Sequence, residues 1–204
     1  MKQRIVCLDF EGTLSPELWP LIAEKTNVDE LKLTTREHPS FPDLMTRRMA
    51  TMNKHGIKLK DIEEIVKAAE PLDGAQDFLN RLRQREPKVV IASDLAEQLA
   101  LPILGKLGNP LFFGHRFVTN DDGSFDHYQF RQDDPKRKLV DAYHSINMLV
   151  SAAGDSYNDI AMLQAADNSC LFRAPDKVRE EFPQFPHTDN YDELFDQLTE
   201  GAEL

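Results

Sequence analysis

Three short runs of consecutive apolar residues divide the chain, and each run ends at polar residues. They cover residues 4–8, 88–92 and 147–153. Because successive side chains of a strand point to opposite faces, a strand built from such a run is apolar on both faces. Strands of this kind lie buried within parallel sheets. We therefore predict that the three runs form the core strands of a mainly parallel sheet.

The segments between these strands carry apolar residues at helical spacing. Asp134 followed by Pro135 is typical of an N-cap and the first position of a helix, here one that runs to about His144. Ser156 begins a further helical pattern. An earlier helix has its apolar face at Ala75, Phe78, Leu79 and Leu82. This alternation of strands and helices predicts an α/β, doubly wound fold.

Two segments depart from this alternation. Residues 16–71 show only helical signals, and their apolar stripes are Met45, Met49 and Met52, and Ile62, Ile65, Val66 and Ala69. Because this insertion follows the first strand, we expect a helical cap over the carboxyl ends of the strands, with 1–15 and 72–204 as the core. The second departure is a predicted β-hairpin, with a turn at residues 121–123 and strands at residues 116–120 and 124–131.

Composition narrows the class of protein. The 204 residues, 41% hydrophobic and 29% charged, are typical of a soluble globular chain with one core and a small second module. The apolar runs are too short for a membrane span or a signal peptide, so we expect a cytoplasmic protein. The net charge of −11 argues against nucleic-acid and membrane partners but allows a small anionic substrate held through a metal ion. Cys7 and Cys170 lie in apolar contexts and are expected to be buried, reduced thiols. The sequence does not predict an oligomeric state.

Polar residues at the ends of the predicted strands carry the candidate chemistry. Asp9, Ser93 and Asp155 each follow one of the three strands. The carboxyl ends of parallel strands share one edge of the sheet, so these side chains are expected to converge. Carboxylates in close proximity repel each other unless a proton or cation lies between them, and oxygen ligands suit Mg²⁺. The sequence therefore predicts a magnesium site at this edge of the sheet.

These residues form part of a larger pattern that resembles a known family. Residues 9–14 read DFEGTL and residues 154–159 read GDSYND, while Ser93 follows a strand and Lys136 begins a helix. In type and order they are similar to the four signatures of the haloacid-dehalogenase-like hydrolases. The resemblance implies a Rossmann-like core, phosphoryl transfer through an aspartate, and Mg²⁺ as the cofactor.

Further residues resemble the phosphoserine phosphatases of this family. Glu17, Phe41 and Arg48 fall where those enzymes hold their substrate. The chain is most similar to the bifunctional subgroup that acts as phosphoserine phosphatase and phosphoserine:homoserine phosphotransferase. The segments that resemble this subgroup cover residues 31–36, 55–58, 134–137 and 181–186. The resemblance implies phosphoserine as the substrate and homoserine as a second acceptor of the phosphoryl group.

The resemblance assigns the reaction to Asp9 and Glu11. Asp9 would attack phosphorus and carry the phosphoryl group, which divides one difficult displacement into two easier ones, and would also bind the metal. Glu11 would protonate the leaving oxygen and then activate the second nucleophile, while its backbone carbonyl ligates the metal. The alternatives are a strand-end aspartate that caps a turn and a solvated glutamate within that turn. Most relatives have Asp at the position of Glu11, so the longer side chain requires a different loop or a folded-back carboxylate.

The last of the four signatures, residues 154–159, contains the other expected metal ligands. Asp155 is expected to bind Mg²⁺ directly. Asp159 lies one helical turn later on the same side and is expected either to bind through water or to orient a neighbouring group. The alternative for Asp159 is a first-turn acid that interacts favourably with the helix dipole. Asn158 is expected to donate to the phosphate.

Two further residues are expected to bind the phosphate. Lys136 is a cation in the first turn of a helix, where the macrodipole opposes it, so an anion should lie close by. That anion is either a phosphate oxygen or a neighbour, Asp133 or Asp134. Ser93 is expected to bind phosphate through its hydroxyl, or else to be a plain strand-end serine. Asp94 and the leucine after it replace a glycine pair of the phosphoserine phosphatases, which should alter either the phosphate geometry or the choice of acceptor.

The predicted cap contributes three candidate substrate-binding residues. Arg48 falls within the methionine stripe, where a guanidinium is costly unless it meets an anion such as a substrate carboxylate or extends to solvent. Glu17 is expected to bind the substrate ammonium. Phe41 either shields the site or begins a helix core. The six histidines have no metal-binding spacing, and no role is predicted for them.

Two other functions remain open from the sequence, and a third, a non-catalytic binding module, is disfavoured because every expected acid is present. One is a phosphatase for a different small phosphomonoester. The other is a receiver-like signalling module, which also holds an aspartyl-phosphate on a doubly wound sheet. The long helical insertion and the acid two residues after Asp9 favour an enzyme over a receiver.

Overall fold

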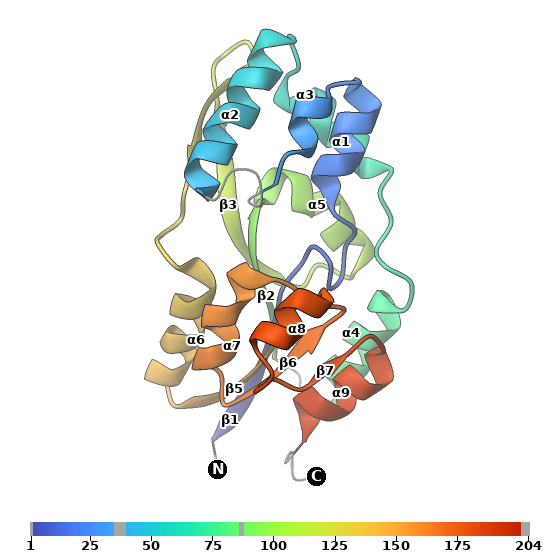
Figure 1. The fold of residues 1–204 in the computed structure, drawn as a ribbon, viewed down its shortest axis with the longest axis vertical. Helices are drawn as coiled ribbons and strands as arrows, with labels where there is room; N and C mark the ends of the chain where they lie inside the picture. Colours follow the sequence, from blue (N-terminus) through green and yellow to red (C-terminus); the bar gives the residue numbers. More distant parts are fainter. Residues whose placement is uncertain (1, 35–39, 86–87, 201–204) are drawn as a thin grey trace.

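The protein folds around a twisted sheet with helices on both faces (Figure 1). The computed structural model describes residues 2–34, 40–85 and 88–200. Its seven-stranded sheet has the order β4-β3-β2-β1-β5-β6-β7, and every neighbouring pair is parallel except β3 and β4. The strands are β1 Gln3–Leu8, β2 Val89–Ala96, β3 Leu111–Thr119, β4 Phe125–Gln129, β5 Met148–Gly154, β6 Asn168–Phe172 and β7 His187–Thr188. The predicted α/β fold is confirmed, and the three predicted core strands are the adjacent central strands β2, β1 and β5.

Alternate residues of β1 face two separate apolar layers. Ile5 and Cys7 pack with residues of α6 and α7, whereas Val6 and Leu8 pack on the side of α4 and α9. The helices of these layers are α4 Ala75–Arg85, α5 Glu97–Lys106, α6 Pro135–Ser145, α7 Ile160–Ala165, α8 Asp176–Glu181 and α9 Tyr191–Thr199. Burial of both strand faces is why residues 5–8 of β1 are all apolar, whereas Gln3 and Arg4 at its less buried start are polar. Both cysteines are buried free thiols, as predicted.

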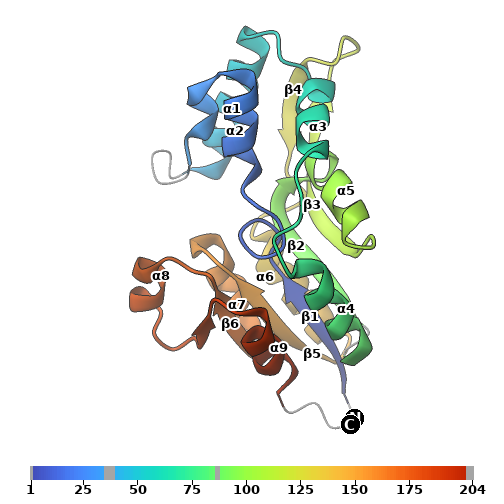
Figure 2. The same ribbon diagram turned by 90° about the vertical axis from the view of Figure 1, so that its right-hand side faces the viewer.

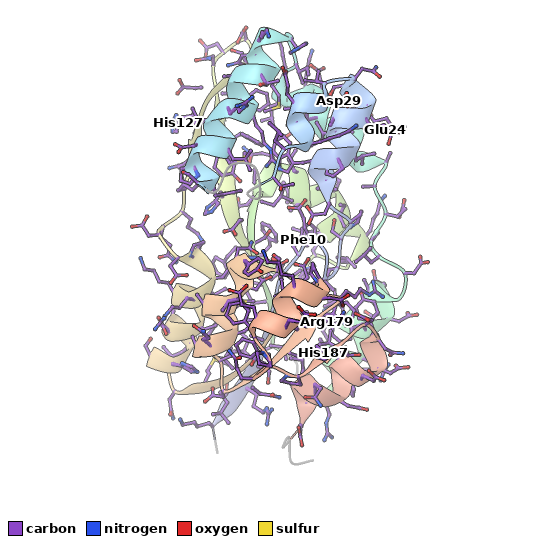
Figure 3. All side chains as sticks on the ribbon, in the orientation of Figure 1. Phe10, Glu24, Asp29, His127, Arg179 and His187 are labelled. Carbon is purple, nitrogen blue, oxygen red and sulfur yellow. The ribbon has the colours of Figure 1, made fainter. Side chains whose placement is uncertain are left out.

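A separate group of helices lies beyond the carboxyl ends of the central strands (Figures 1 and 2). It comprises α1 Leu18–Thr26, a 3₁₀ turn at Asp29–Lys32, α2 Phe41–Lys54 and α3 Leu59–Lys67. The predicted apolar stripes bury Met45, Met49 and Met52 of α2, and Ile62 and Val66 of α3. Figure 3 places Glu24 and Asp29 at this helical end and Phe10 between the helices and the sheet. Phe10 is fully buried and packs edge-on against Phe112, with ring centroids 5.6 Å apart.

The helical group is bonded to the β3–β4 hairpin, which extends alongside it (Figure 2). The side chain of Asn53 donates to the backbone carbonyl of Phe125 (2.7 Å) and accepts from its N–H (2.9 Å). Lys58 donates through Nζ to the carbonyl of Asp122 at the hairpin turn (2.6 Å). An amide side chain that bonds both backbone groups of one residue acts as an extra strand partner. The helices and the hairpin therefore form one structural unit.

The structure corrects several details of the predicted elements. The hairpin strand predicted to begin at residue 116 begins at Leu111, because its first half pairs with β2, and β4 ends at Gln129. Asp134 stands at the N-cap of α6, but its left-handed backbone (φ 48°) leaves the side chain without a capping bond. Residues 35 and 36 of the predicted 31–36 segment lie outside the described residues. No described helix combines the length and apolarity that crossing a membrane requires.

Candidate active site

The central strands bring the predicted acidic residues together. Asp9 directly follows β1, and Asp155 directly follows β5, which pairs with β1 along its whole length. Asp159 ends the 3₁₀ turn Tyr157–Asp159 that precedes α7. One carboxylate oxygen from each of these three residues lies within 4.8 Å of the others. The convergence predicted for Asp9 and Asp155 is therefore present, whereas Ser93, predicted to follow a strand, lies within β2.

Lys136 provides the positive charge within this acidic group. It lies in the first turn of α6, is only 2% exposed, and donates to Asp9 Oδ1 (2.6 Å) and Asp159 Oδ1 (2.7 Å). Burial alone would lower the pKa of Lys136, but Asp159 and Asp9 raise it well above the usual value. The lysine is therefore paired with site carboxylates, and its ion pairs do not involve Asp133 or Asp134.

One ammonium does not balance three carboxylates, and the pKa values of the acids reflect this. Burial, followed by repulsion from Asp159, raises the pKa of Asp9 well above its usual value. The same two causes raise the pKa of Asp155 to about 7. Such shifts mean that a further cation would be bound favourably. The all-oxygen ligand set and its close spacing fit a hard divalent ion such as Mg²⁺.

Asp159 also organises the turn that carries Asp155. It is fully buried, and its Oδ2 accepts the backbone N–H groups of Asp155 (3.0 Å) and Ser156 (3.1 Å). Its other oxygen accepts from Lys136. With both oxygens bonded in this way, Asp159 fixes the backbone of Asp155 and holds the lysine, as the prediction of an orienting residue requires.

Gly154 leaves the space that Asp159 occupies. A Cβ atom at Gly154 would lie 2.3 Å from Cγ of Asp159. We expect Gly154→Ala to displace this carboxylate, lower kcat/KM by about a hundredfold and lower the free energy of unfolding by about 2 kcal/mol. Enzyme kinetics and denaturant unfolding measure the two effects. The matched control is Gly105→Ala in α5, where a Cβ meets nothing within 4 Å; equal losses in both variants would contradict the steric argument.

Glu11 is bonded to the first helix of the helical group. Its Oε1 accepts the N–H of Leu18, the first residue of α1, at 2.8 Å. Removal from water and the proximity of Glu17 raise the pKa of Glu11 to about 8. The longer side chain of Glu, compared with Asp, thus reaches back to the helix. Since the carboxyl group is half-buried and bonded, Glu11 is not a solvated turn residue.

The predicted phosphate donors lie around Asp94. Asn158 donates through Nδ2 to Asp94 Oδ2 (2.7 Å), and Lys136 Nζ lies 3.9 Å from the same oxygen. Ser93 is buried, and its Oγ accepts the N–H of Leu95 (3.1 Å). The carboxylate that replaces a glycine of the resembled enzymes therefore occupies a position next to two of the three predicted donors.

Arg48 is held inside the helical group with one donor unused. Its side chain is 5% exposed, so it does not extend to solvent. Nη2 donates to the carbonyl of Leu33 (2.8 Å), and the guanidinium lies 4.0 Å above the ring of Trp19. Nε is buried and has no hydrogen-bond partner among the described residues. Burial lowers the pKa of Arg48 to about 10, which Glu11 partly counteracts, so the group remains a cation.

The other two candidate substrate residues occupy the same end of the molecule. Glu17 is exposed at the N-cap of α1 and lies close enough to raise the pKa of both Glu11 and Asp155. Phe41 begins α2 and packs against Phe130, with ring centroids 6.1 Å apart.

Sequence reasoning did not identify His115. This histidine of β3 is 2% exposed, and its Nε2 lies 3.6 Å from Asp94 Oδ1. Its Nδ1 accepts the backbone N–H of Arg131 (3.1 Å). A single histidine in an apolar strand has no sequence pattern that marks a site, and its position depends on how β3 pairs with β2.

Comparisons of the sequence with known proteins point to one family. The chain matches the family model described as haloacid dehalogenase-like hydrolase over residues 3–167. Over 190 residues it is 45% identical to phosphoserine phosphatase of Pseudomonas syringae pv. tomato, covering 93% of this chain and 80% of that protein. It is also 45% identical to phosphoserine phosphatase ThrH of Pseudomonas aeruginosa, over 93% of this chain and 92% of that protein.

Solved structures show that the fold is shared as well. Phosphoserine phosphatase in its apo form superposes with a TM-score of 0.74 at 22% identity, covering 88% of this chain and 91% of that chain. A phospho-aspartyl intermediate analogue of phosphoserine phosphatase gives a TM-score of 0.73 at 20% identity, over 89% and 91%. With a matching family model over most of its length and two relatives at 45% identity, the chain belongs to the haloacid dehalogenase-like hydrolases.

Proposed function

We propose that this hydrolase is a Mg²⁺-dependent phosphoserine phosphatase that acts through an aspartyl-phosphate on Asp9. The observation that carries the proposal is the buried position of Asp9, bonded to Lys136 and within 4.8 Å of oxygens from Asp155 and Asp159. A carboxylate placed among a lysine and other acids is arranged to meet a phosphoryl group that arrives with a divalent cation. The names of the two relatives at 45% identity support phosphoserine as the substrate.

The reaction proceeds in two displacements. An oxygen of Asp9 attacks phosphorus, and the bond between phosphorus and the serine oxygen breaks. Glu11, whose pKa of about 8 keeps it protonated near neutral pH, gives its proton to that oxygen as serine leaves. Glu11 then accepts a proton from water, whose oxygen attacks phosphorus and releases Asp9 and inorganic phosphate. Lys136, Ser93 and Asn158 hold the phosphoryl oxygens.

The metal site uses residues at the ends of β1 and β5. Asp9, the backbone carbonyl of Glu11 and Asp155 would hold Mg²⁺, while Asp159 orients Asp155 and balances Lys136. When bound, the ion draws negative charge from the phosphoryl oxygens and makes phosphorus more electrophilic.

Residues 16–71 are proposed to act as the specificity lid over the core formed by 1–15 and 72–204. Arg48 would bind the substrate carboxylate through Nε, which has no hydrogen-bond partner among the described residues. Glu17 would bind the substrate ammonium, and Phe41 would exclude water from the closed site. The opposite charges of Arg48 and Glu17 match a zwitterionic amino acid better than a plain phosphomonoester.

Arg48→Lys is expected to raise the KM for phosphoserine about thirtyfold and to change kcat little. A lysine keeps the charge but has no donor at the position of Nε, the group assigned to the substrate carboxylate. Steady-state kinetics with phosphoserine separate the two constants. The matched control is Arg47→Lys, the same change on the exposed side of α2. An Arg48→Lys variant with an unchanged KM would show that the carboxylate binds elsewhere.

Homoserine is proposed as a second acceptor, in keeping with the bifunctional subgroup that the sequence resembles. Hydrolysis and transfer share the first displacement and differ only in the hydroxyl that then attacks phosphorus. The homoserine hydroxyl oxygen would attack phosphorus in place of water and lose its proton to Glu11. The bond between phosphorus and Asp9 would break, and phosphohomoserine would leave.

One experiment tests these assignments together. Purified protein is assayed with phosphoserine and Mg²⁺, with and without homoserine, in parallel with EDTA and a panel of other phosphomonoesters. We expect release of serine and phosphate, loss of turnover in EDTA, and phosphohomoserine when homoserine is present. Turnover of another phosphomonoester without phosphoserine would assign a different substrate, and a single phosphorylation without turnover would indicate a receiver-like module.

A further inference from the structure

Asp94 is an anion fixed beside the groups that are proposed to hold phosphate. Its Oδ2 accepts from Asn158 and lies 3.9 Å from Lys136 Nζ, and both of these residues are proposed to hold the phosphoryl oxygens. Although partial burial would raise it, the pKa of Asp94 is lowered to about 2 by Lys136, His115 and Asn158. The side chain is 22% exposed, so it borders the open part of the site.

Residues of the β3–β4 hairpin contact both the backbone and the carboxylate of Asp94. The Tyr128 hydroxyl donates to the backbone carbonyl of Asp94 at 2.8 Å. Because His115 Nδ1 accepts the N–H of Arg131, a neutral His115 carries its proton on Nε2, which faces Asp94 Oδ1 at 3.6 Å. The imidazole is packed edge-on against Tyr128 and Phe130, with ring centroids 5.6 and 5.2 Å away. Asp94 is thus anchored through its backbone and faced by donors on both carboxylate oxygens.

We infer that Asp94, held by His115 and Tyr128, is a positioning residue that competes with phosphate for Asn158 and Lys136 and so weakens the hold of the site on inorganic phosphate. A phosphate dianion that enters this site must share two donors with a fixed negative charge. The charge therefore favours release of the last product. This inference rests on the proposed phosphate-binding role of those donors, and it adds a specificity-determining role for the residue that departs from the glycine of the resembled phosphatases.

The test measures binding of inorganic phosphate by titration calorimetry on Mg²⁺-saturated protein. Asp94→Asn removes the charge, and Asp94→Ala removes both the charge and the acceptor of Asn158. Both variants are expected to bind phosphate about tenfold more tightly than the wild type, since one like charge is removed from the partly exposed site. Inorganic phosphate should correspondingly inhibit them at lower concentration, and kcat should fall where product release limits it.

The matched control is Asp141→Asn, which removes one carboxylate from the exposed side of α6, where it pairs with Arg137. It should leave phosphate affinity unchanged. Melting temperatures confirm that each variant is folded. If Asp94 only supports the structure, both Asp94 variants will bind phosphate more weakly or equally, which overturns the inference. Tighter phosphate binding together with absent phosphoserine turnover in the wild type would instead overturn the proposed substrate and leave the inference standing.

Discussion

The Asp9→Asn variant is expected to lose both phosphoserine hydrolysis and transfer to homoserine, by about a thousandfold or more. The amide is nearly isosteric with the carboxylate but is not nucleophilic toward phosphorus, and both activities begin with the same displacement. Release of phosphate, serine and phosphohomoserine is measured at saturating Mg²⁺. Retained turnover of either kind would mean that the nucleophile lies elsewhere.

Loss of activity in this variant should not come from unfolding. Because its surroundings raise the pKa of Asp9 well above the usual value, ionised Asp9 destabilises the metal-free folded state at neutral pH. Asn removes that cost, while Lys136 keeps its bond to Asp159. In EDTA the variant should therefore melt at the same temperature as the wild type or higher. Mg²⁺ should stabilise it less than the wild type, because one ligand charge is gone.

Lys136→Met is expected to lose activity to a similar extent and, unlike Asp9→Asn, to lose stability. The change removes the ammonium that lies between Asp9 and Asp159 and leaves buried carboxylates without a counter-charge. Removing one partner of a buried ionic group costs about 3 kcal/mol or more in the free energy of unfolding. Denaturant unfolding in EDTA measures this loss.

The same unfolding measurement, repeated with added Mg²⁺, tests whether the carboxylates form a metal site. If the acids form the metal site, added Mg²⁺ supplies the missing positive charge and should restore part of the stability of Lys136→Met. Lys138→Met is the matched control, since Lys138 lies on the exposed side of the same helix. Unchanged stability of Lys136→Met in EDTA would mean that the ammonium does not neutralise these carboxylates.

The central strands could be predicted because a strand that is buried on both faces is apolar at nearly every position. The runs that became β1, β2 and β5 are apolar at nearly every position, and the helical stripe of α4 buries each residue expected of it. The first half of β3 was missed because Leu111 and Phe112 could suit either a strand or a buried helix. The pairing of Leu111 with Val90 of β2 makes this segment a strand, and that contact is between residues far apart in the sequence.

The site residues likewise divide into those that the sequence could predict and those that it could not. Asp9 and Asp155 were placed correctly because topology alone brings the ends of parallel strands together. The bond from Glu11 to Leu18 and that from Arg48 to Leu33 depend on loop paths that periodicity does not describe. Asp134 occupies the predicted N-cap position of α6, but with a left-handed backbone its side chain makes no capping hydrogen bond. His115 reaches Asp94 only through the register that pairs it with Ala96.

If residues 16–71 act as the proposed lid, the bonds from Asn53 and Lys58 to the hairpin should limit how a substrate enters. A lid joined to the chain only at its two ends would swing freely on those connectors. Here the helices are also bonded to β4 at Phe125 and to the hairpin turn at Asp122, so uncovering Asp9 would twist the hairpin as well. Under the proposed mechanism, access to Asp9 would therefore depend on the flexibility of the β3–β4 hairpin. A chimera that borrows helices from a relative should work only if it borrows the matching hairpin too.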